Sequence, residues 1–245
     1  MVQQLTPDTA PELVYPESDG KPMADNTKQF RWIVTIKENL EILFASQSDV
    51  FIAGDLLWYP VEGNNKLCQA PDIMVVFGRP KADRGSYLQW KENNIAPQVV
   101  FEILSPSNTT KEMTNKLLFY QRYGVEEYYI YNPDTLELTG LLRSGDDLEI
   151  IEEMNGWVSP RLGVRFVLTP ETLEIYRPDG QRFLTPVELD QVREKERQRA
   201  EQERQRAEQE RQQKEAALQQ LEQEQQRYQE LLARLREKGI DPEKL

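Results

Sequence analysis

The pattern of apolar and polar positions predicts two helices in the first two thirds of the chain. Apolar residues recur at helical spacing between Thr27 and Phe44, and Asn26 or Thr27 can cap the first turn. A second helix is predicted over Thr109–Tyr123. Gly124 follows it at the position where many helices end in a left-handed conformation.

Short runs of apolar and β-branched residues predict strands between and after these helices. Before the second helix the runs occupy 50–60, 70–77 and 96–104. After it they occupy 126–133, a hairpin over 136–151 with its turn at 144–147, and the segments 162–168 and 173–183. The order helix, strands, helix, strands predicts an α/β (α+β) domain in which helices flank a mixed central sheet.

The predicted domain covers residues 25–186, and the segments on either side differ from it in composition. Residues 1–24 are rich in proline and acidic residues and predict an extended arm. Residues 187–239 predict a charged helical or coiled-coil tail, because the heptad RQRAEQE occurs twice in succession from residue 197. Gly239 and Pro242 are expected to end this helix, which leaves 240–245 as a short C-terminal end.

Two interpretations of the tail remain open. Its last three heptads place apolar residues at alternating spacings of three and four, with a polar gap at Gln225. These residues are Leu218, Leu221, Tyr228, Leu232 and Leu235. In the earlier heptads the same positions hold arginine and alanine, which indicates a solvated single helix held by Glu–Arg pairs four residues apart. The other interpretation is a homodimer, parallel or antiparallel, packed through the last three heptads.

Composition and charge exclude several classes of chemistry. The chain has no histidine and one cysteine, Cys68, which argues against Ser-His-Asp triads, histidine-based zinc sites and a disulfide framework. The net charge is −12, and residues 187–245 hold 15 of the 42 acidic and 13 of the 30 basic residues. The first part is therefore acidic, a poor match for nucleic acid unless bound cations reverse the local field. We expect a cytoplasmic protein without a signal peptide or membrane span.

Two carboxylates in apolar strands are the strongest chemical signal. Asp72 begins a run that is apolar on both faces, and Glu102 lies inside the run 99–104. Burying either carboxylate is costly unless it is paired or binds a cation, and two such strands in one sheet suggest a shared ligand such as Mg²⁺ or Mn²⁺. Lys116, in the second predicted helix, could neutralise them. The simpler alternative is a structural Glu–Lys pair.

These residues also resemble a known family. Pro71-Asp72, followed 30 residues later by Glu102 within EILSP, resembles the PD-(D/E)xK nuclease superfamily, and more narrowly the Uma-type restriction endonuclease family. The resemblance extends from Tyr15 to Phe183 and includes GDLLWYPVEG, APDIMVVFGRP and GVEEYYIYNPD. It implies a restriction-endonuclease-like core.

The resemblance also implies roles for the site residues. Asp72 and Glu102 would bind Mg²⁺ or Mn²⁺ with the backbone carbonyl of Ile103, and Lys116 would position the attacking water or stabilise negative charge. The chain departs from the motif at Leu104, where the superfamily has lysine, and Lys116 of the following helix takes that place. Possible accessory residues are Asp55, Glu112, Glu17 and Asp19, although Asp55 fits a turn and the last two fit a solvated arm.

The resulting prediction is a Mg²⁺-dependent endonuclease that hydrolyses phosphodiester bonds, with DNA as substrate. The alternative is a non-catalytic interaction protein with a nuclease fold that dimerises through its coiled-coil tail.

Overall fold

The computed structural model describes residues 13–20 and 22–238, and the chain separates into two compact units between Pro186 and Val187. Each unit is described by itself. The first contains a central sheet with strand order β1-β3-β5-β6-β7-β8. These strands are Val50–Gly54, Ile73–Phe77, Val99–Ile103, Glu127–Asn132, Glu137–Ser144 and Asp147–Ile150, in that order. The fold is therefore of the predicted mixed α/β class.

The direction of each strand follows from its connection. β5 and β6 are parallel and are joined through a helix, whereas the other neighbouring pairs of this sheet are antiparallel. A parallel pair needs such a crossover, while the β7–β8 hairpin needs only a tight turn. Because β5 lies between β3 and β6, the two strands expected to carry carboxylates are neighbours.

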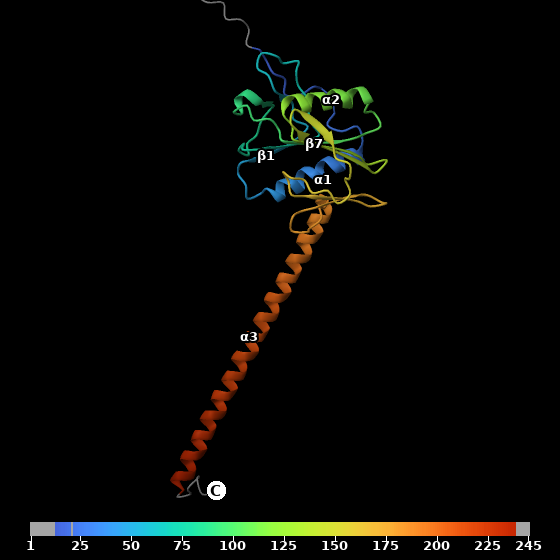
Figure 1. Cartoon of the computed structure of the whole chain (residues 1–245). Helices are drawn as coiled ribbons and strands as arrows, with labels where there is room; N and C mark the ends of the chain where they lie inside the picture. Colours follow the sequence, from blue (N-terminus) through green and yellow to red (C-terminus); the bar gives the residue numbers. More distant parts are fainter. Residues whose placement is uncertain (1–12, 21, 239–245) are drawn as a thin grey trace, which may run out of the picture. The chain divides into compact units, whose positions relative to one another are not determined.

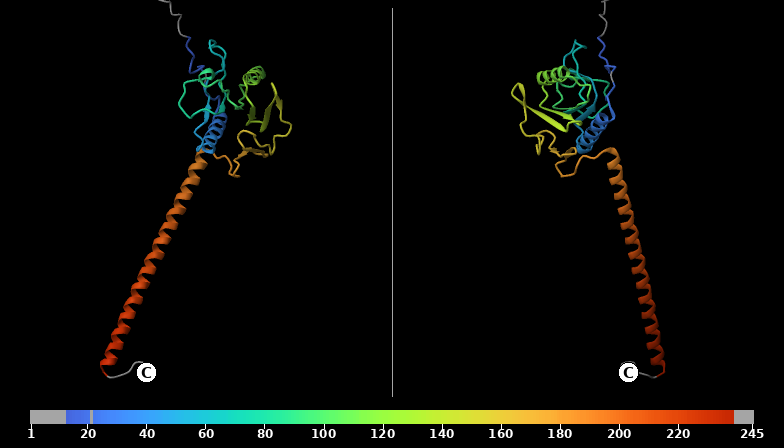
Figure 2. Two further views of the ribbon diagram at one scale, coloured as in Figure 1. Left: turned by 60° about the vertical axis from the view of Figure 1, so that its left-hand side comes forward. Right: turned by 90° about the vertical axis from the view of Figure 1, so that its right-hand side faces the viewer.

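Helices α1 (Thr27–Leu43) and α2 (Thr110–Tyr123) cover opposite faces of the sheet (Figures 1 and 2). Asn26 caps the first turn of α1, and Gly124 ends α2 in the left-handed conformation, as predicted, whereas Thr109, predicted as the first residue of α2, is its cap. Alternate residues of each strand pack on the α1 face or the α2 face and form two apolar clusters. Burial of apolar surface on both faces is the main force that holds the sheet between its helices.

Two small β structures complete the first unit, and one of them corrects the predicted strand over 50–60. That run breaks at Asp55, whose φ is +49°, so β1 is followed by a separate strand β2 (Trp58–Tyr59). β2 pairs in parallel with β4 (Tyr87–Leu88), which the sequence pattern did not indicate and which leads into the 3₁₀ helix η1 (Gln89–Lys91). The second structure is the antiparallel pair of β9 and β10, Arg165–Leu168 and Leu173–Tyr176.

The described part of the N-terminal arm packs onto the first unit. The Tyr15 ring contacts the rings of Tyr59 and Trp90, and the Tyr59 hydroxyl donates a hydrogen bond to the Pro16 carbonyl. Aromatic contacts therefore anchor this segment at Tyr15, while Glu17 and Asp19 remain exposed. Residues 1–12, also predicted as arm, lie outside the described residues.

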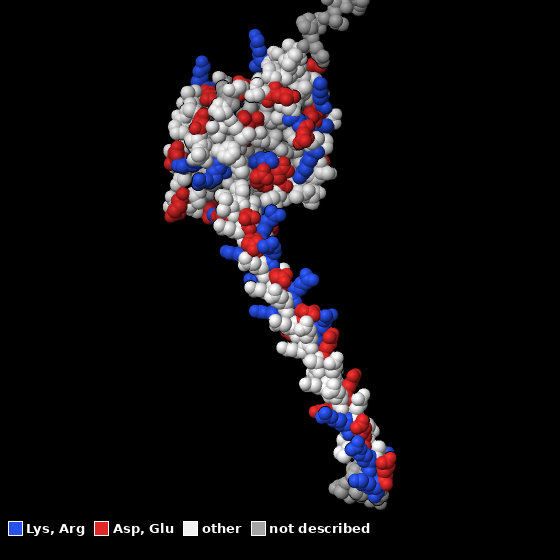
Figure 3. Space-filling view, turned by 180° about the vertical axis from the view of Figure 1, so that it is seen from behind, with Lys and Arg blue, Asp and Glu red and all other residues white. Residues whose placement is uncertain are grey.

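The described part of the second unit belongs to one helix, α3 (Pro186–Glu237, 52 residues), which begins at the last residue of the first unit and agrees with the predicted helical tail. Basic and acidic side chains both occur along it (Figure 3). The predicted Glu–Arg pairs four residues apart are not the ones observed: the ion pairs Glu194–Arg197 and Glu208–Arg211 are three apart, and glutamine takes the positions four apart. Gly239 and Pro242 lie outside the described residues. None of the described helices is both long and apolar enough to cross a membrane.

Candidate functional site

The register of β3 and β5 brings the two predicted carboxylates together. Ile73 pairs with Phe101, so Asp72, just before β3, lies across from Glu102 in β5. Oδ2 of Asp72 accepts a hydrogen bond from the backbone N–H of Ile103 at 2.6 Å. Because alternate strand residues share a face, both carboxylates point toward the α2 side of the sheet, opposite to the face that Phe101 and Ile103 bury against α1.

Helix α2 supplies two donors to Glu102, whose side chain is almost completely buried. Nζ of Lys116 donates to Oε2 at 2.7 Å, and the hydroxyl of Tyr120 donates to Oε1 at 2.5 Å. Lys116 and Tyr120 are four residues apart and therefore lie on one face of the helix. Both oxygens of Glu102 thus have a donor, which offsets much of the cost of burying this carboxylate.

Asp72 is less well compensated. Desolvation and the neighbouring charge of Glu102 raise the pKa of Asp72 well above its ordinary value, although Lys116 and the N–H of Ile103 act in the opposite direction. Burial alone would lower the pKa of Lys116, but the charges of Glu102 and Asp72 outweigh it and the pKa is raised. The site thus holds two carboxylates against one buried ammonium group, and Lys116 stays protonated at neutral pH.

The backbone carbonyl of Ile103, predicted as a metal ligand, already accepts a hydrogen bond in the structure. Its donor is Nε2 of Gln29 in α1, at 2.8 Å. Gln29 is buried, and its own Oε1 accepts from the backbone N–H of Asp25. A carbonyl oxygen has two lone pairs, so this contact leaves room for one further partner.

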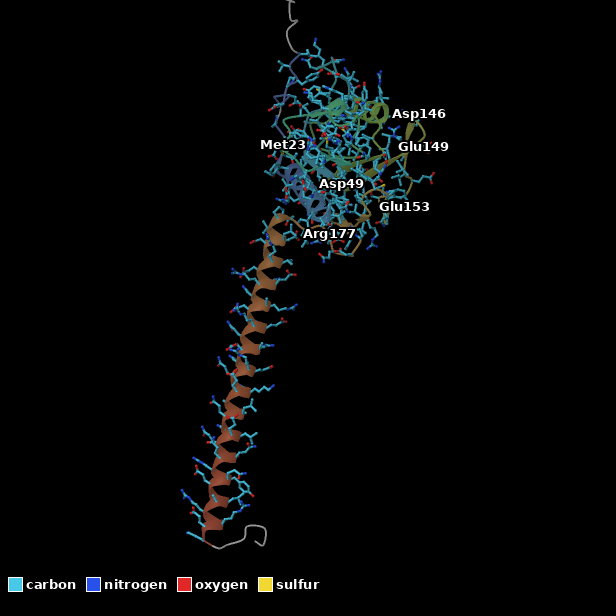
Figure 4. The ribbon with its side chains drawn as sticks, turned by 90° about the vertical axis from the view of Figure 1, so that its left-hand side faces the viewer. Met23, Asp49, Asp146, Glu149, Glu153 and Arg177 are labelled. Carbon is cyan, nitrogen blue, oxygen red and sulfur yellow. The ribbon has the colours of Figure 1, made fainter. Side chains whose placement is uncertain are left out.

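Beside these residues lies a cavity of about 620 Å³. Its wall includes Asp72 and Lys116 and also polar residues from the loop that precedes α2, among them Ser107 and Thr109. Figure 4 shows Met23, another residue of the wall, on one side of the first unit. The cavity gives the partly exposed carboxylate of Asp72 access to a ligand from solution.

The accessory candidates fall into two groups. Asp55, Glu112 and Asp19 line the cavity. Burial, together with the charge of Asp19, raises the pKa of Asp55, so these two carboxylates are close enough to repel each other. Glu17 is not part of the wall, and its side chain lies against Gly85. Asp55 both occupies the predicted turn and faces the cavity.

Ser105 and Ser107 lie in the loop before α2 but do not cap this helix. The first turn of α2 is capped by Thr109, whose hydroxyl accepts from the N–H of Glu112. The hydroxyls of both serines instead donate to the carboxylate of Asp25. They therefore shape the loop at the cavity rim and tie it to the residues that precede α1.

The donor set fits a hard divalent cation that keeps part of its water shell. Within the described part of the chain, no three His, Cys, Asp or Glu side chains converge closely enough to hold a metal ion among themselves. Two carboxylates and a carbonyl oxygen leave the remaining positions to water. Mg²⁺ commonly binds through one or two carboxylates and several waters. A cation between Asp72 and Glu102 would relieve the repulsion that contributes to the raised pKa of Asp72.

Comparison with protein families matches residues 17–203 to Uma2, described as "Putative restriction endonuclease". The chain belongs to the Uma2 family. The Uma2 match confirms the family predicted from the motifs and supports a nuclease. It spans β3, β5 and α2, the three elements around the cavity, and continues into α3.

Among solved structures, the chain is similar to a putative nuclease belonging to DUF820 from Anabaena variabilis. The two are 19% identical, the match covers 57% of this chain and 74% of the other, and the TM-score is 0.42. No curated protein matches the chain.

Two residues at the Uma2 site were not singled out from the sequence. The spacing of four between Tyr120 and Lys116 was the signal that could have placed Tyr120 beside Glu102. Gln29 had no comparable signal, because its bond to Ile103 joins residues 74 positions apart.

Proposed function

We propose that this chain is a divalent-metal-dependent endonuclease that hydrolyses phosphodiester bonds in DNA. The observation that carries the proposal is the pair of Asp72 and Glu102, opposed across β3 and β5, with Lys116 between α2 and the sheet and a cavity alongside. Membership of the Uma2 family supports the nuclease class, and the choice of DNA rests on the restriction-endonuclease description of that family.

Asp72 and Glu102 would hold Mg²⁺ or Mn²⁺, with the carbonyl of Ile103 as a third ligand. A divalent ion at this place would polarise the scissile phosphate and lower the pKa of a bound water. The hydrogen bond from the Ile103 N–H fixes one oxygen of Asp72, so its other oxygen is the one directed to a ligand. Gln29 holds the peptide that carries the carbonyl.

Lys116 acts as a donor of hydrogen bonds and positive charge. Its ammonium group has three N–H donors, and one of them donates a hydrogen bond to Glu102 in the structure. Because the charges of Glu102 and Asp72 raise its pKa, Lys116 carries its proton and suits the role of a donor better than that of the base that activates water. It would instead hold a water or a phosphate oxygen and stabilise negative charge that develops in the transition state. Asp55, Glu112 and Asp19 would be accessory residues on the cavity wall.

Nicking of supercoiled plasmid DNA tests the proposal. We expect the full chain to convert the plasmid to open circles in Mg²⁺ or Mn²⁺ but not in EDTA, and Asp72→Asn and Lys116→Met to abolish this activity. The matched control is Asp146→Asn, because Asp146 is exposed and lies on the side of the unit away from Met23 (Figure 4). Equal activity in all four proteins would contradict the proposal, since it would indicate a contaminating nuclease.

The alternative function, a non-catalytic interaction protein with this fold, predicts that Mg²⁺ does not bind at the site. Thermal melts distinguish the two functions, because an ion that binds the folded state raises the melting temperature by linkage. We expect Mg²⁺ to stabilise the wild type and Asp146→Asn but not Asp72→Asn. An unchanged melting temperature in the wild type, together with no nicking, would favour the interaction protein.

A further inference from the structure

Helix α3 carries an apolar surface that its own unit leaves uncovered. Leu218 and Leu221 each have 51% of their surface exposed, and Tyr228 has 60%. In the heptad that begins at Arg204, written a to g, these residues occupy positions a, d and d, and Leu232 occupies position a. Apolar residues thus form a stripe along the last three heptads, interrupted at Gln225, and three of them are exposed in the single chain, which is the arrangement of a helix that packs against another helix.

The a and d positions of the earlier heptads oppose a parallel in-register pair. In such a pair each a residue faces its own copy, so Arg204 would meet Arg204 and Arg211 would meet Arg211. At position d, Lys214 would meet Lys214. Three layers would bring like charges together inside the seam, where they are poorly solvated.

The flanking g and e positions also argue against a parallel in-register pair. In a parallel pair a g residue faces the e residue five positions later in the other chain. Glu203 would then face Glu208, and Glu210 would face Glu215. Both contacts repel and, by symmetry, each would occur twice.

An antiparallel pair centred between Gln226 and Arg227 removes these conflicts. In this register position a of one chain faces position d of the other, so Leu221 meets Leu232 and Gln225 meets Tyr228. Leu218 lies opposite position 235. The polar Gln225 thus meets the polar end of a tyrosine in the middle of the seam.

The flanking charges also become favourable in this register. Antiparallel helices bring e positions beside e positions, so Glu215 lies beside Arg236, and Glu222 lies beside the neutral Gln229. The residues Arg204 and Arg211 have no a or d partner within the overlap, because the other helix ends near residue 237. Charge complementarity therefore selects one occupant for the apolar stripe, a second copy of α3 running in the opposite direction.

We propose that the chain forms an antiparallel homodimer through the last three heptads of α3, with Leu221 packed against Leu232 of the second copy. This interaction is separate from the nuclease site and uses no residue of it.

The oligomeric state of the full chain tests the first part of the proposal. Sedimentation equilibrium should show a dimer for the wild type, and Leu221→Lys should weaken the dimer by roughly tenfold or more because it buries a charge in the seam. The matched control is Gln223→Lys at the outward position f, which adds the same charge and should leave the dimer intact. A monomeric wild type, or equal weakening by both variants, would overturn the proposal.

Single-cysteine crosslinking tests the direction. In a background with Cys68→Ser, Leu221→Cys and Leu232→Cys should each fail to crosslink alone and should crosslink when the two proteins are mixed. Efficient crosslinking of each variant with itself would indicate a parallel pair and overturn the register. Spin labels at Ala216→Cys, on the outward face, leave the seam intact. Two such labels should lie about 30 Å apart or more in the antiparallel pair, and a distance below about 20 Å would contradict it.

Discussion

Replacing Lys116 by methionine should destabilise the first unit strongly, because it leaves the buried Glu102 and the partly exposed Asp72 beside it without their cation. Nζ of Lys116 lies 2.7 Å from Oε2 of Glu102, and the two side chains are 12% and 3% exposed. At that separation and an effective dielectric constant of about 20, the attraction is about 6 kcal/mol before desolvation is subtracted. Breaking a buried pair on one side typically costs about 3–5 kcal/mol, so we expect a loss of about 3 kcal/mol in the free energy of unfolding.

Urea denaturation in EDTA, followed by tryptophan fluorescence, measures this loss. The four tryptophans, at positions 32, 58, 90 and 157, all belong to the first unit, so the signal does not include α3. Methionine keeps most of the length of the lysine stem, which limits the effect of lost packing. In a thermal melt, a loss of about 3 kcal/mol corresponds to about 6–12 °C for a unit of this size.

A double-mutant cycle with Glu102→Gln separates the pair energy from packing. Glutamine retains an oxygen that can accept from Tyr120 but removes the charge that Lys116 faces. The double variant Glu102→Gln/Lys116→Met should be more stable than the sum of the single effects predicts, by about 2–3 kcal/mol. A coupling energy below about 0.5 kcal/mol, the value of an exposed pair, would refute the claim that this is a buried and desolvated ion pair.

Three further changes test other parts of the structure by the same urea assay. Tyr120→Phe removes the donor to Oε1 of Glu102 and should cost about 1–2 kcal/mol, and an unchanged midpoint would mean that water replaces the hydroxyl. Burial raises the pKa of Glu127 above its ordinary 4.5 despite three hydrogen-bond donors. The stability that Glu127 contributes is therefore complete below pH 4.5 and is lost as the pH rises through its folded pKa. Over that pH range the wild type should lose stability relative to Glu127→Gln. A constant difference in stability between the two proteins would contradict this. Gly140→Ala places a Cβ 2.4 Å from Sδ of Met154 and should cost about 1–3 kcal/mol, whereas a neutral result would show that this side chain moves aside.

The helices and most strands were predictable because local signals specify them. Asn26 and Thr109 are good capping residues, Gly124 provides the left-handed end of α2, and apolar residues mark the buried positions of both helices. The run 50–60 was predicted as one strand although Asp55 fits a turn, because the residues that follow Asp55 remain apolar. Its left-handed backbone is held by hydrogen bonds from its N–H to the carbonyls of Pro71 and Asp72, which come from another part of the chain.

The strand β4 was likewise not predictable from its own segment. It has two residues, and its pairing with β2 depends on a contact between segments almost thirty residues apart. A two-residue strand has no periodicity to detect, so propensity alone carries no signal for it.

The part of the candidate site that could be predicted is the part for which a single strand shows a carboxylate that is costly to bury. Asp72 and Glu102 stand out because carboxylates are rare in apolar strands, and the register of β3 and β5 brings them together. The donors that hold Glu102 and the Ile103 carbonyl come from α2 and α1, and their contacts depend on how each helix is seated on the sheet. Tyr120 and Gln29 were therefore not assigned to the site from the sequence.

The most direct test of the central claim is a crystal structure of the full chain soaked in Mn²⁺, with the anomalous signal of the metal measured. The proposed function predicts an anomalous peak about 2.0–2.3 Å from a carboxylate oxygen of both Asp72 and Glu102, and no peak in the Asp72→Asn variant. A wild-type map without a peak between these two carboxylates, while Lys116 remains bound to Glu102, would contradict it and leave the buried pair with a structural role.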